Sequence, residues 1–510
     1  MAESSTPDSL RPDNADLVAR DRRFFGHPLG LLTLFTTELW ERFSYYGMRA
    51  ILLLFLTAEL TEGGLAIDST TGQAVVAIYG TGVYLLTIVG GWLADRMIGA
   101  RRSVLYGGIV IAAGHVSLAL PGGAWSFLGI VLVAIGTGLL KANVSSMVGE
   151  LYHRDDPRRD SAFSIFYMGI NIGSFFSPIV VGLVRGIWGF HAGFLVAAIG
   201  MGFALIFFVG GHRLVAHAGE DVPNPITREE LPRVLRLVGI VVGAIAVLAV
   251  IAALLCGGFG LVAIVDTLSY AAFLAPIAAF VVMYRSPKVT RPERLRLSAY
   301  VPLFVAAMLF WMIFEQAATT MTVFAATQTD LSLFGLTLQP ENFQSVNPLS
   351  IIILSPVFAL IWLKTNDRPA VPYKFALGLA LAALSFIVLA AGAWLTGDGK
   401  APALLLILVY VIQTLGELCL SPVGLAATTL LAPRAFRGQA MGLWFLAPAA
   451  GTAITAQVVQ LTEGVSDVAY FGVTGLIALA FAVAMFFITP WARRQMHEAD
   501  RLEGVVTAGE

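Results

Sequence analysis

Four charged side chains lie between Glu38 and Arg49, in a stretch that is otherwise apolar enough to cross a bilayer. At about 100° per residue, the polar side chains of this stretch fall on one face of a helix. They are Glu38, Glu41, Arg42, Tyr45, Tyr46 and Arg49. Ionisable groups at membrane depth cost about 2.5–3.5 kcal/mol each on insertion scales, and they normally face a bundle interior or a transport pathway. We therefore expect this helix to line a pathway, with its apolar face against lipid or neighbouring helices.

Two further ionisable residues lie deep in apolar runs, Lys141 after Gly-Leu-Leu and Glu315 after Phe-Trp-Met-Ile-Phe. Neither can stay charged in hydrocarbon without a partner. Because they lie at comparable depth in opposite halves of the chain, we expect a salt bridge between them. Protonation of Glu315 would then release Lys141 and couple proton binding to a conformational change. The alternative is a static, structural bridge.

Glu417 is the only acid of its apolar run, and Ser421-Pro422 one turn later can loosen that helix. A lone carboxylate suits an ammonium group, whereas Arg42 and Lys141 in the other half suit a carboxylate. A peptide carries both groups whatever its side chains are. We therefore place Glu417 and Ser421 among the substrate-binding residues; a packing contact of Glu417 with another helix is the alternative.

Amides and aromatic rings complete the candidate site. Asn171 and Asn347 lie inside apolar runs and can donate and accept hydrogen bonds at the same time. They suit the backbone or the termini of a peptide, and they equally suit contacts between helices. The candidate aromatic residues are Tyr45, Tyr46, Tyr84, Tyr167, Trp311 and Trp444. Such rings in a helical bundle serve packing more often than a binding pocket.

The run from Gly91 to Arg102 ends an apolar segment with several charges, and Asp95 and Arg96 are its central pair. We expect a gating loop that locks against a neighbouring helix in one conformation. The chain has no His-Glu-x-x-His and no Gly-x-Ser-x-Gly motif, and Gly136-Thr-Gly lacks the spacing of a phosphate loop. We therefore expect no enzymatic activity, no catalytic residues, no metal site and no cofactor. The energy for transport would come from an ion gradient.

Composition points to an integral membrane protein, because 57% of the 510 residues are hydrophobic and only 13% are charged. The net charge of −1 removes any general argument for nucleic acid binding. The two cysteines, Cys256 and Cys419, lie in apolar runs and do not suggest disulfides. The polar first 23 residues do not resemble a cleaved signal peptide.

The apolar runs predict an all-α polytopic membrane protein with about fourteen transmembrane helices. The expected helices cover residues 29–58, 73–95, 103–120, 124–149, 161–184, 189–211, 234–256, 259–284, 299–327, 343–364, 373–396, 401–431, 436–460 and 468–491. The expected division is a cytoplasmic tail (1–28), an amino-terminal six-helix bundle (29–211), a linker with two inserted helices (212–298), a carboxy-terminal six-helix bundle (299–491) and a cytoplasmic tail (492–510).

Positive charge predicts the orientation of these helices, because cytoplasmic segments collect Lys and Arg. With a cytoplasmic amino terminus, the outer segments hold only Arg185 and Lys400. We therefore expect a multi-pass protein of the inner (cytoplasmic) cell membrane with both termini in the cytoplasm.

The two six-helix sets show signs of a repeat. Glu41 and Glu315 are 274 positions apart, and the Asp95-Arg96 and Asp367-Arg368 pairs are 272 apart. Parallel repeats of this kind occur in transporters that hold their substrate between two halves near the bilayer midplane.

These motifs together resemble the proton-dependent oligopeptide transporter family of the major facilitator superfamily. The most specific element is Glu38-x-x-Glu41-Arg42-Phe43-x-Tyr45-Tyr46-Gly47. It is supported by Gly-Leu-Leu-Lys141, Phe166-Tyr167-x-x-x-Asn171, Phe310-Trp311-x-x-x-Glu315-Gln316, Asn347-Pro348 and Gly416-Glu417. The resemblance implies the major facilitator fold, with two extra helices between the halves as in bacterial members.

The resemblance also implies a function, the import of di- and tripeptides with protons by alternating access. It assigns Arg42 and Lys141 to the peptide carboxylate, and it assigns Glu417, Asn171 and Asn347 to the ammonium end. It assigns the six aromatic residues above to the pocket, and Glu38, Glu41 and Glu315 to proton coupling. Animal members carry a histidine in the second helix, and none lies between residues 73 and 95 here. Proton coupling would therefore depend on carboxylates. A carrier of nitrate or a modified amino acid on the same scaffold is the alternative.

Overall fold

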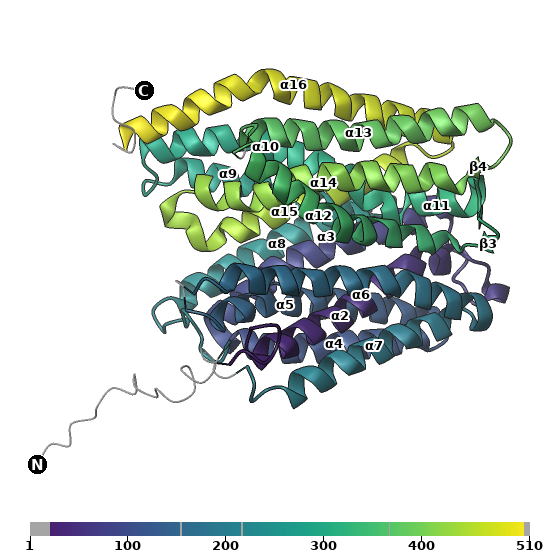
Figure 1. Ribbon diagram of the computed structural model, residues 1–510, viewed down its shortest axis with the longest axis horizontal. Coiled ribbons are helices and arrows are strands. Elements are labelled where there is room, and N and C mark those ends of the chain that lie inside the picture. The colour runs from purple at the N-terminus through teal and green to yellow at the C-terminus, as the bar shows by residue number, and fades with distance from the viewer. Residues whose placement is uncertain (1–20, 154–155, 216–217, 367, 504–510) are drawn as a thin grey trace, which may run out of the picture.

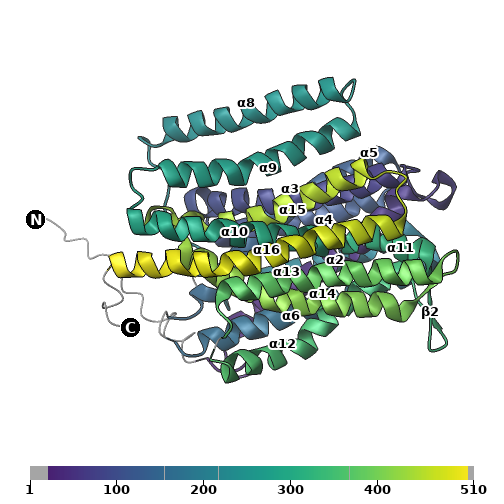
Figure 2. The same cartoon turned by 90° about the horizontal axis from the view of Figure 1, so that it is seen from above.

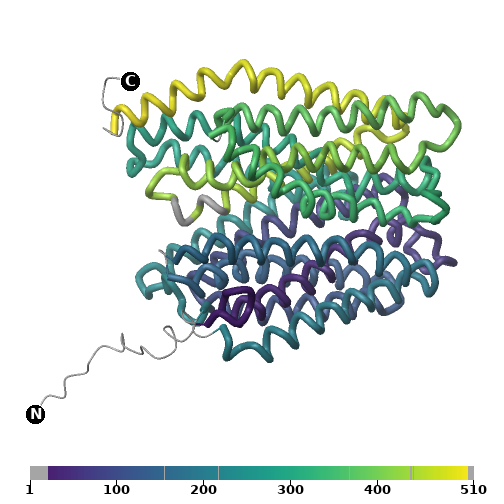
Figure 3. The backbone as a smooth tube through the Cα atoms, in the orientation of Figure 1, coloured from purple at the N-terminus to yellow at the C-terminus, as the bar shows by residue number. Residues whose placement is uncertain are grey.

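A computed structural model describes residues 21–153, 156–215, 218–366 and 368–503. Within these ranges, fourteen long helices run side by side along the long axis, if an interrupted helix is counted once (Figure 3). Thirteen of them are long and apolar enough to cross a membrane. The fourteenth is α2 (Leu29–Thr57), which carries the charged stretch. The predicted number of helices is confirmed.

The helices form two layers (Figure 1), and a pair of helices lies to one side of them (Figure 2). The first layer contains α2, α3 (Ser69–Leu93), α4 (Ala100–Ala119), α5 (Gly123–Glu150), α6 (Arg159–Trp188) and α7 (Phe190–Gly210). The second layer contains α10 (Arg291–Phe314), α11 (Thr320–Gln328), α12 (Val346–Lys364), α13 (Val371–Thr396), α14 (Ala403–Leu431), α15 (Ala440–Leu461) and α16 (Asp467–Leu502). Each layer has an apolar core of its own. Below, they are called the first and second bundle.

Short elements connect these helices. They are η1 (Leu60–Glu62), the π-helical turn η2 (Ala94–Ile98), and the 3-10 turns η3 (Glu315–Ala318), η4 (Pro340–Ser345) and η5 (Arg434–Gln439). Strand β1 (Thr329–Asp330) pairs in parallel with β4 (Ala401–Pro402), and β2 (Ser332–Leu333) pairs antiparallel with β3 (Leu336–Thr337).

Helices α8 (Leu231–Leu255) and α9 (Leu261–Arg285) lie together along one side of the molecule, with α8 outermost (Figure 2). Nearly every side chain of α8 is exposed, and nearly all of them are apolar. An exposed apolar helix of 25 residues is what a lipid-facing span requires.

Two expected segment boundaries fall inside helices. Helix α10 begins at Arg291 rather than near residue 299, because Thr290 and Glu293 form a capping box at its start. Helix α16 continues past residue 491 to Leu502, where Arg296 pairs with both Asp500 and Glu503. Charged ends of this kind lie outside the apolar runs, so hydrophobicity alone does not detect them.

The helix that carries Glu315 is interrupted, whereas the sequence predicts a continuous helix there. Helix α10 ends at Phe314, η3 follows, and Thr319 leaves the helical conformation (φ −124°, ψ −104°) before α11 begins. The carbonyl of Ala317 accepts hydrogen bonds from Thr322 (2.7 Å) and Tyr410 (3.4 Å). Broken helices are tolerated in membranes where other groups satisfy the freed backbone, and transporters use them at binding sites.

Helix α2 is positioned by a close approach to α6. A Cβ built on Gly173 of α6 would lie 2.2 Å from the carbonyl oxygen of Leu39. The outer face of the same contact is an apolar groove of about 380 Å³. It is lined by Leu39, Trp40, Phe43, Ile172, Gly173, Phe176, Val180, Val196, Ile199 and Gly200. The apolar face of α2 therefore points toward neighbouring helices and lipid, opposite the charged face.

We expect Gly173→Ala to destabilise the protein by about 1–3 kcal/mol, because the methyl group would push α2 away from α6. The measurement is the thermal unfolding midpoint in detergent. Gly202→Ala is the matched control, since a Cβ at Gly202 meets nothing within 4 Å. An equal midpoint for the two variants would show that the α2–α6 contact is not tight.

Candidate functional site

The charged residues of α2 form a buried cluster on one side of that helix. The Nε atom of Arg42 lies 2.8 Å from Glu38 Oε1 and 2.7 Å from Glu41 Oε2, and these side chains are at most 3% exposed. Beyond these ion pairs, several buried atoms of the cluster have no hydrogen-bond partner in the described chain: Glu38 Oε2, Glu41 Oε1 and Arg42 Nη2. The cluster therefore keeps donors and acceptors for a polar ligand or a proton.

Aromatic rings surround this cluster. The guanidinium of Arg42 lies 5.7 Å from the ring centre of Tyr45, within the range of a cation–π contact. Tyr45 packs edge to face on Tyr46 (5.2 Å) and stacks on Tyr79 of α3 (6.3 Å). Tyr79 was not among the predicted site residues, although it lies in the same apolar run as Tyr84.

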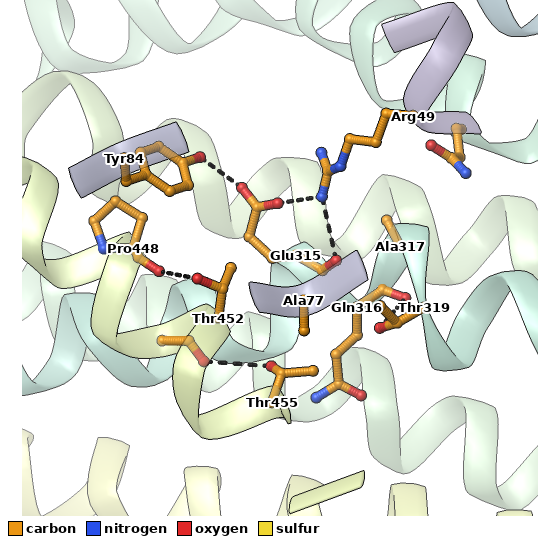
Figure 4. A network of polar contacts seen from close by, with 12 residues as sticks. Arg49, Ala77, Tyr84, Glu315, Gln316, Ala317, Thr319, Pro448, Thr452 and Thr455 are labelled. Atoms are coloured by element: carbon orange, nitrogen blue, oxygen red, sulfur yellow. Dashed lines mark hydrogen bonds and ion pairs between the residues drawn. The ribbon is translucent and has the colours of Figure 1, made fainter. Parts of the chain in front are cut away.

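Glu315 joins the two bundles, but through a different partner from the one expected. One carboxylate oxygen of Glu315 pairs with the guanidinium of Arg49 from α2, and the other accepts a 2.7 Å hydrogen bond from the hydroxyl of Tyr84 (Figure 4). Arg49 also donates to the main-chain carbonyl of Glu315 (3.4 Å). That carbonyl belongs to η3, where the helix is interrupted.

The expected Lys141–Glu315 salt bridge is therefore absent from the described chain. The ammonium of Lys141 lies 4.6 Å from the ring centre of Tyr84 and 5.9 Å from that of Phe445. No carboxylate of the described residues lies within ion-pair distance of it. The predicted bridge is wrong because Arg49, on the charged face of α2, forms the ion pair with Glu315 in place of Lys141. Lys141 is left to interact with two rings, one from each bundle.

Besides Tyr79, two residues of this region had no predicted role, Arg49 and Phe445. Arg49 was placed on the polar face of α2 but had no partner. Phe445 stacks on Tyr84 across the bundles, with 6.4 Å between ring centres. Its position next to Trp444 was the available signal.

Glu417 and Asn347 meet in the second bundle. Asn347 of α12 donates a 2.9 Å hydrogen bond to Glu417 Oε2 and lies 3.0 Å from the hydroxyl of Thr414. No cation of the described chain pairs with Glu417. A partly buried carboxylate held only by an amide has capacity for an incoming cation.

The other predicted residues are placed as follows. The Nδ2 atom of Asn171 donates to the carbonyl of Tyr167 in its own helix (2.9 Å), and Tyr167 is half exposed. Trp311 packs on Phe310 and Phe314, and its Nε1 atom is buried without a partner in the described chain, as is Ser421 Oγ. Trp444 is buried against Gly424 of α14. In the described chain, no hydrogen bond links these five side chains to Glu38, Glu41, Glu315 or Glu417.

Helices α3 and α15 form the main seam between the bundles. Thr81 and Thr452 share a 2.8 Å hydrogen bond across it, and Thr81 also donates to the carbonyl of Ala449 (3.3 Å). Tyr84 and Phe445 lie on the same two helices. Tyr84 contacts both Glu315 and Lys141, so the α3–α15 seam brings these two residues near each other.

One end of the bundles is closed by contacts between α6 and η4. Arg185 pairs with the buried Glu341 (2.7 Å) and donates to Gln339 (2.7 Å). Ser345 donates to the carbonyl of Phe175 (2.8 Å), and Asn342 donates to that of Pro178 (3.2 Å). All of these contacts join the first bundle to the second, so they must break before the two bundles can separate at this α6–η4 end.

We expect Glu341→Gln to raise the population of a conformer open at the α6–η4 end by about tenfold or more, because truncating a buried charge pair costs about 2–5 kcal/mol. The measurement is the distance distribution between spin labels at the exposed positions Trp188 and Phe334, with both native cysteines replaced. Asp330→Asn, an exposed carboxylate at this end, is the control. An unchanged distribution in Glu341→Gln would show that the Arg185–Glu341 pair does not hold this end closed.

Asp95 and Arg96 lie in η2, away from the clusters above. Their main-chain carbonyls accept from the amides of Asn224 and Ile226, and Arg96 pairs with Glu230 just before α8. The Thr227 amide and the Arg96 guanidinium lower the pKa of Glu230. The side chain of Asp95 is exposed. In this conformation the expected gating loop therefore docks on the segment before α8, and Asp367 of the second motif lies outside the described residues.

Residues 101–477 match the model of the POT family. The chain belongs to this family. It is 42% identical over 488 residues to a di-/tripeptide transporter of Lactococcus lactis, covering 93% of this chain and 97% of that protein. It is 46% identical to the transporter YclF of Bacillus subtilis, covering 95% and 98%. A crystal structure of a peptide transporter POT in complex with sulfate matches this POT-family chain with a TM-score of 0.89 and 48% identity, covering 94% and 99%. The predicted fold class and family are confirmed.

Proposed function

We propose that this protein is a proton-coupled symporter that imports di- and tripeptides by alternating access. The carrying observation is that the first bundle holds two cations, Arg42 and Lys141, while the second bundle holds an acid, Glu417, that pairs with no cation among the described residues. Membership of the POT family and the names of the relatives support peptides as the substrate class. A zwitterionic backbone is the part that all short peptides share.

Arg42 and Lys141 would bind the peptide carboxylate. Arg42 keeps a buried Nη2 without a partner in the described chain, and guanidinium groups bind carboxylates with paired donors. Lys141 interacts with the rings of Tyr84 and Phe445 instead of a carboxylate. Its ammonium can therefore turn to a substrate without breaking an ion pair.

Glu417 would bind the ammonium end of the peptide, with Asn347 holding its carboxylate in place. Asn171 would contribute its amide oxygen, because its Nδ2 atom is already used within its own helix. Tyr45, Tyr46, Tyr84, Tyr167, Trp311, Ser421 and Trp444 would complete the pocket. Sequence-independent recognition of both ends leaves the side chains free to vary.

Glu315 would couple the proton to the movement of the bundles. Protonation removes its charge, and the pair with Arg49 then loses its Coulombic attraction, which is large in a low-dielectric interior. Because that pair crosses between α2 and η3, its loss frees one bundle from the other. Glu38 and Glu41 would take up protons and thereby change how far the positive charge of Arg42 is compensated, and hence its strength as a carboxylate ligand.

The membrane orientation follows from the charge pattern of the loops. Both termini would be cytoplasmic in the inner membrane, and the closed α6–η4 end would face outward. The conformation would thus be closed to the outside. Inward proton movement would then supply the energy for peptide accumulation.

Uptake of a labelled dipeptide into proteoliposomes under an imposed pH gradient, acidic outside, tests this proposal. We expect the labelled dipeptide to accumulate, and a proton ionophore to abolish this accumulation. Unlabelled tripeptides should inhibit the uptake by competing with the labelled dipeptide. Transport of nitrate or of a modified amino acid, without any uptake of or competition by dipeptides, would favour the alternative cargo and overturn the proposal.

A further inference from the structure

Helix α9 packs against both bundles, at the seam where they meet. It contacts α3 of the first bundle and α15 of the second. Val265 and Ala272 of its first half belong to the apolar core of the first bundle. In its second half, Phe280 packs on Tyr300 and Phe304 of α10, at 6.0 and 5.2 Å between ring centres. The helix therefore spans the boundary that alternating access must change.

The polar contacts of α9 are not shared equally between the bundles. Asp266 Oδ1 accepts from Gln457 Nε2 (2.8 Å) and Gln460 Nε2 (3.4 Å), both on α15. Its other oxygen lies 3.5 Å from the thiol of Cys256 at the end of α8. Asp266 is 9% exposed. Among the described residues, no hydrogen bond or ion pair joins α9 to α3.

This asymmetry has a mechanical consequence. A buried carboxylate that loses its donors pays the desolvation cost of an unpaired group, so its contact with α15 is costly to break. Apolar contacts with α3 are non-directional and can be exchanged for others as the surfaces slide. The first half of α9 is therefore tied to α15 and is free to move over α3.

We propose that Asp266 is a positioning residue that fixes the α8–α9 pair to α15, so that both inserted helices move with the second bundle while α9 slides over α3. The proposal rests on the alternating access proposed above. The proposal gives the inserted helices a role. From outside the α3–α15 seam, they would keep the two bundles aligned with each other during each transport cycle. Cys256 would add a link within the pair, from α8 to the same carboxylate.

Spin-label distances test which bundle carries the pair. The three label sites are exposed and lie at one end of the helices: Leu60 in η1 between α2 and α3, Phe259 in the turn between α8 and α9, and Leu461 as the last residue of α15. Cys256→Ser keeps a donor to Asp266, and Cys419→Ala completes the background. The experiment uses pH and dipeptide conditions under which the Leu60–Leu461 distance takes two values.

We expect the Phe259–Leu461 distance to stay constant between the two states while the Phe259–Leu60 distance changes. With Asp266→Ala, the Phe259–Leu461 distribution should broaden. A constant Phe259–Leu60 distance with a changing Phe259–Leu461 distance would overturn the proposal, because the pair would then move with the first bundle. These distances do not depend on which solute is carried, so they separate this proposal from the substrate assignment.

Transport kinetics provide the second readout. We expect Asp266→Ala to lower the maximal rate of dipeptide uptake by about fivefold or more, with KM changed less than about twofold, since the lost hydrogen bonds lie outside the substrate site. Asp266→Asn keeps one acceptor oxygen and should fall between the wild type and Asp266→Ala. Thr267→Val is the matched control, because among the described residues the Thr267 hydroxyl donates only to the carbonyl of Ala263 in its own helix (2.6 Å). Equal maximal rates in Asp266→Ala and Thr267→Val would overturn the positioning role.

Discussion

Glu315→Gln is expected to lower dipeptide accumulation driven by a pH gradient by about 100-fold or more, because breaking a buried ion pair costs about 3–5 kcal/mol and the amide cannot take up a proton. The side chain keeps its shape but loses the charge that holds Arg49 across the bundles. The pair is then permanently in the state that protonation would otherwise produce. Exchange of labelled for unlabelled peptide, which needs no net proton movement, should persist.

Two variants separate the ion pair from the neighbouring hydrogen bond. Tyr84→Phe removes the 2.7 Å hydrogen bond to Glu315 and leaves the pair with Arg49 intact, so gradient-driven uptake should fall only a few-fold. Arg49→Lys keeps the positive charge and should retain more coupled uptake than Arg49→Met. Full gradient-driven accumulation by Glu315→Gln would show that this carboxylate is not an essential proton-coupling site.

Glu417→Gln is expected to weaken dipeptide binding by about 30-fold or more, since removing one member of a buried charge pair costs about 2–5 kcal/mol. In the wild type, the peptide ammonium would supply the cation that Glu417 lacks among the described residues. The measurement is competition of unlabelled dipeptide against labelled dipeptide in proteoliposomes. Asp467→Asn, a partly exposed acid at the start of α16, is the matched control.

The chemistry of the ligand sharpens this test. An amino-terminally acetylated dipeptide has no ammonium group, so the wild type should bind it much more weakly than the free dipeptide. Glu417→Gln should bind the two with nearly equal affinity. If the variant still prefers the free amino terminus as strongly as the wild type does, the ammonium is bound elsewhere.

Much of the fold was predictable because a membrane helix is a local property of the chain. A run of about twenty apolar residues predicts a span wherever it occurs, and the predicted number of helices was correct. Helix α2 is an exception to that rule because it carries four charged residues. The spacing of these residues on one helical face predicted the candidate site. Ends such as those of α10 and α16 were missed because caps and ion pairs beyond the apolar runs set them.

The interruption of the helix at Glu315 was not predictable from hydrophobicity. Residues 315–328 are as compatible with a continuous helix as their neighbours, and no proline marks the break. What stabilises it is tertiary, since hydroxyl groups of Thr322 and Tyr410 and the guanidinium of Arg49 satisfy freed carbonyl groups. An irregular backbone is stable inside a membrane only where packed neighbours satisfy its freed backbone groups.

The sequence by itself determined that ionisable residues lie inside membrane helices, with Arg42, Arg49 and Lys141 in one half and Glu315 and Glu417 in the other. It also determined that α2 carries its charges on one face, because a helix turns by a constant angle per residue. Only the tertiary structure decided that Glu315 pairs with Arg49 rather than Lys141, and that Asp266 binds α15 rather than α3. Pairing across helices depends on how each helix is rotated and how far a side chain reaches. Those quantities arise from the packing of the whole bundle, and local sequence does not contain them.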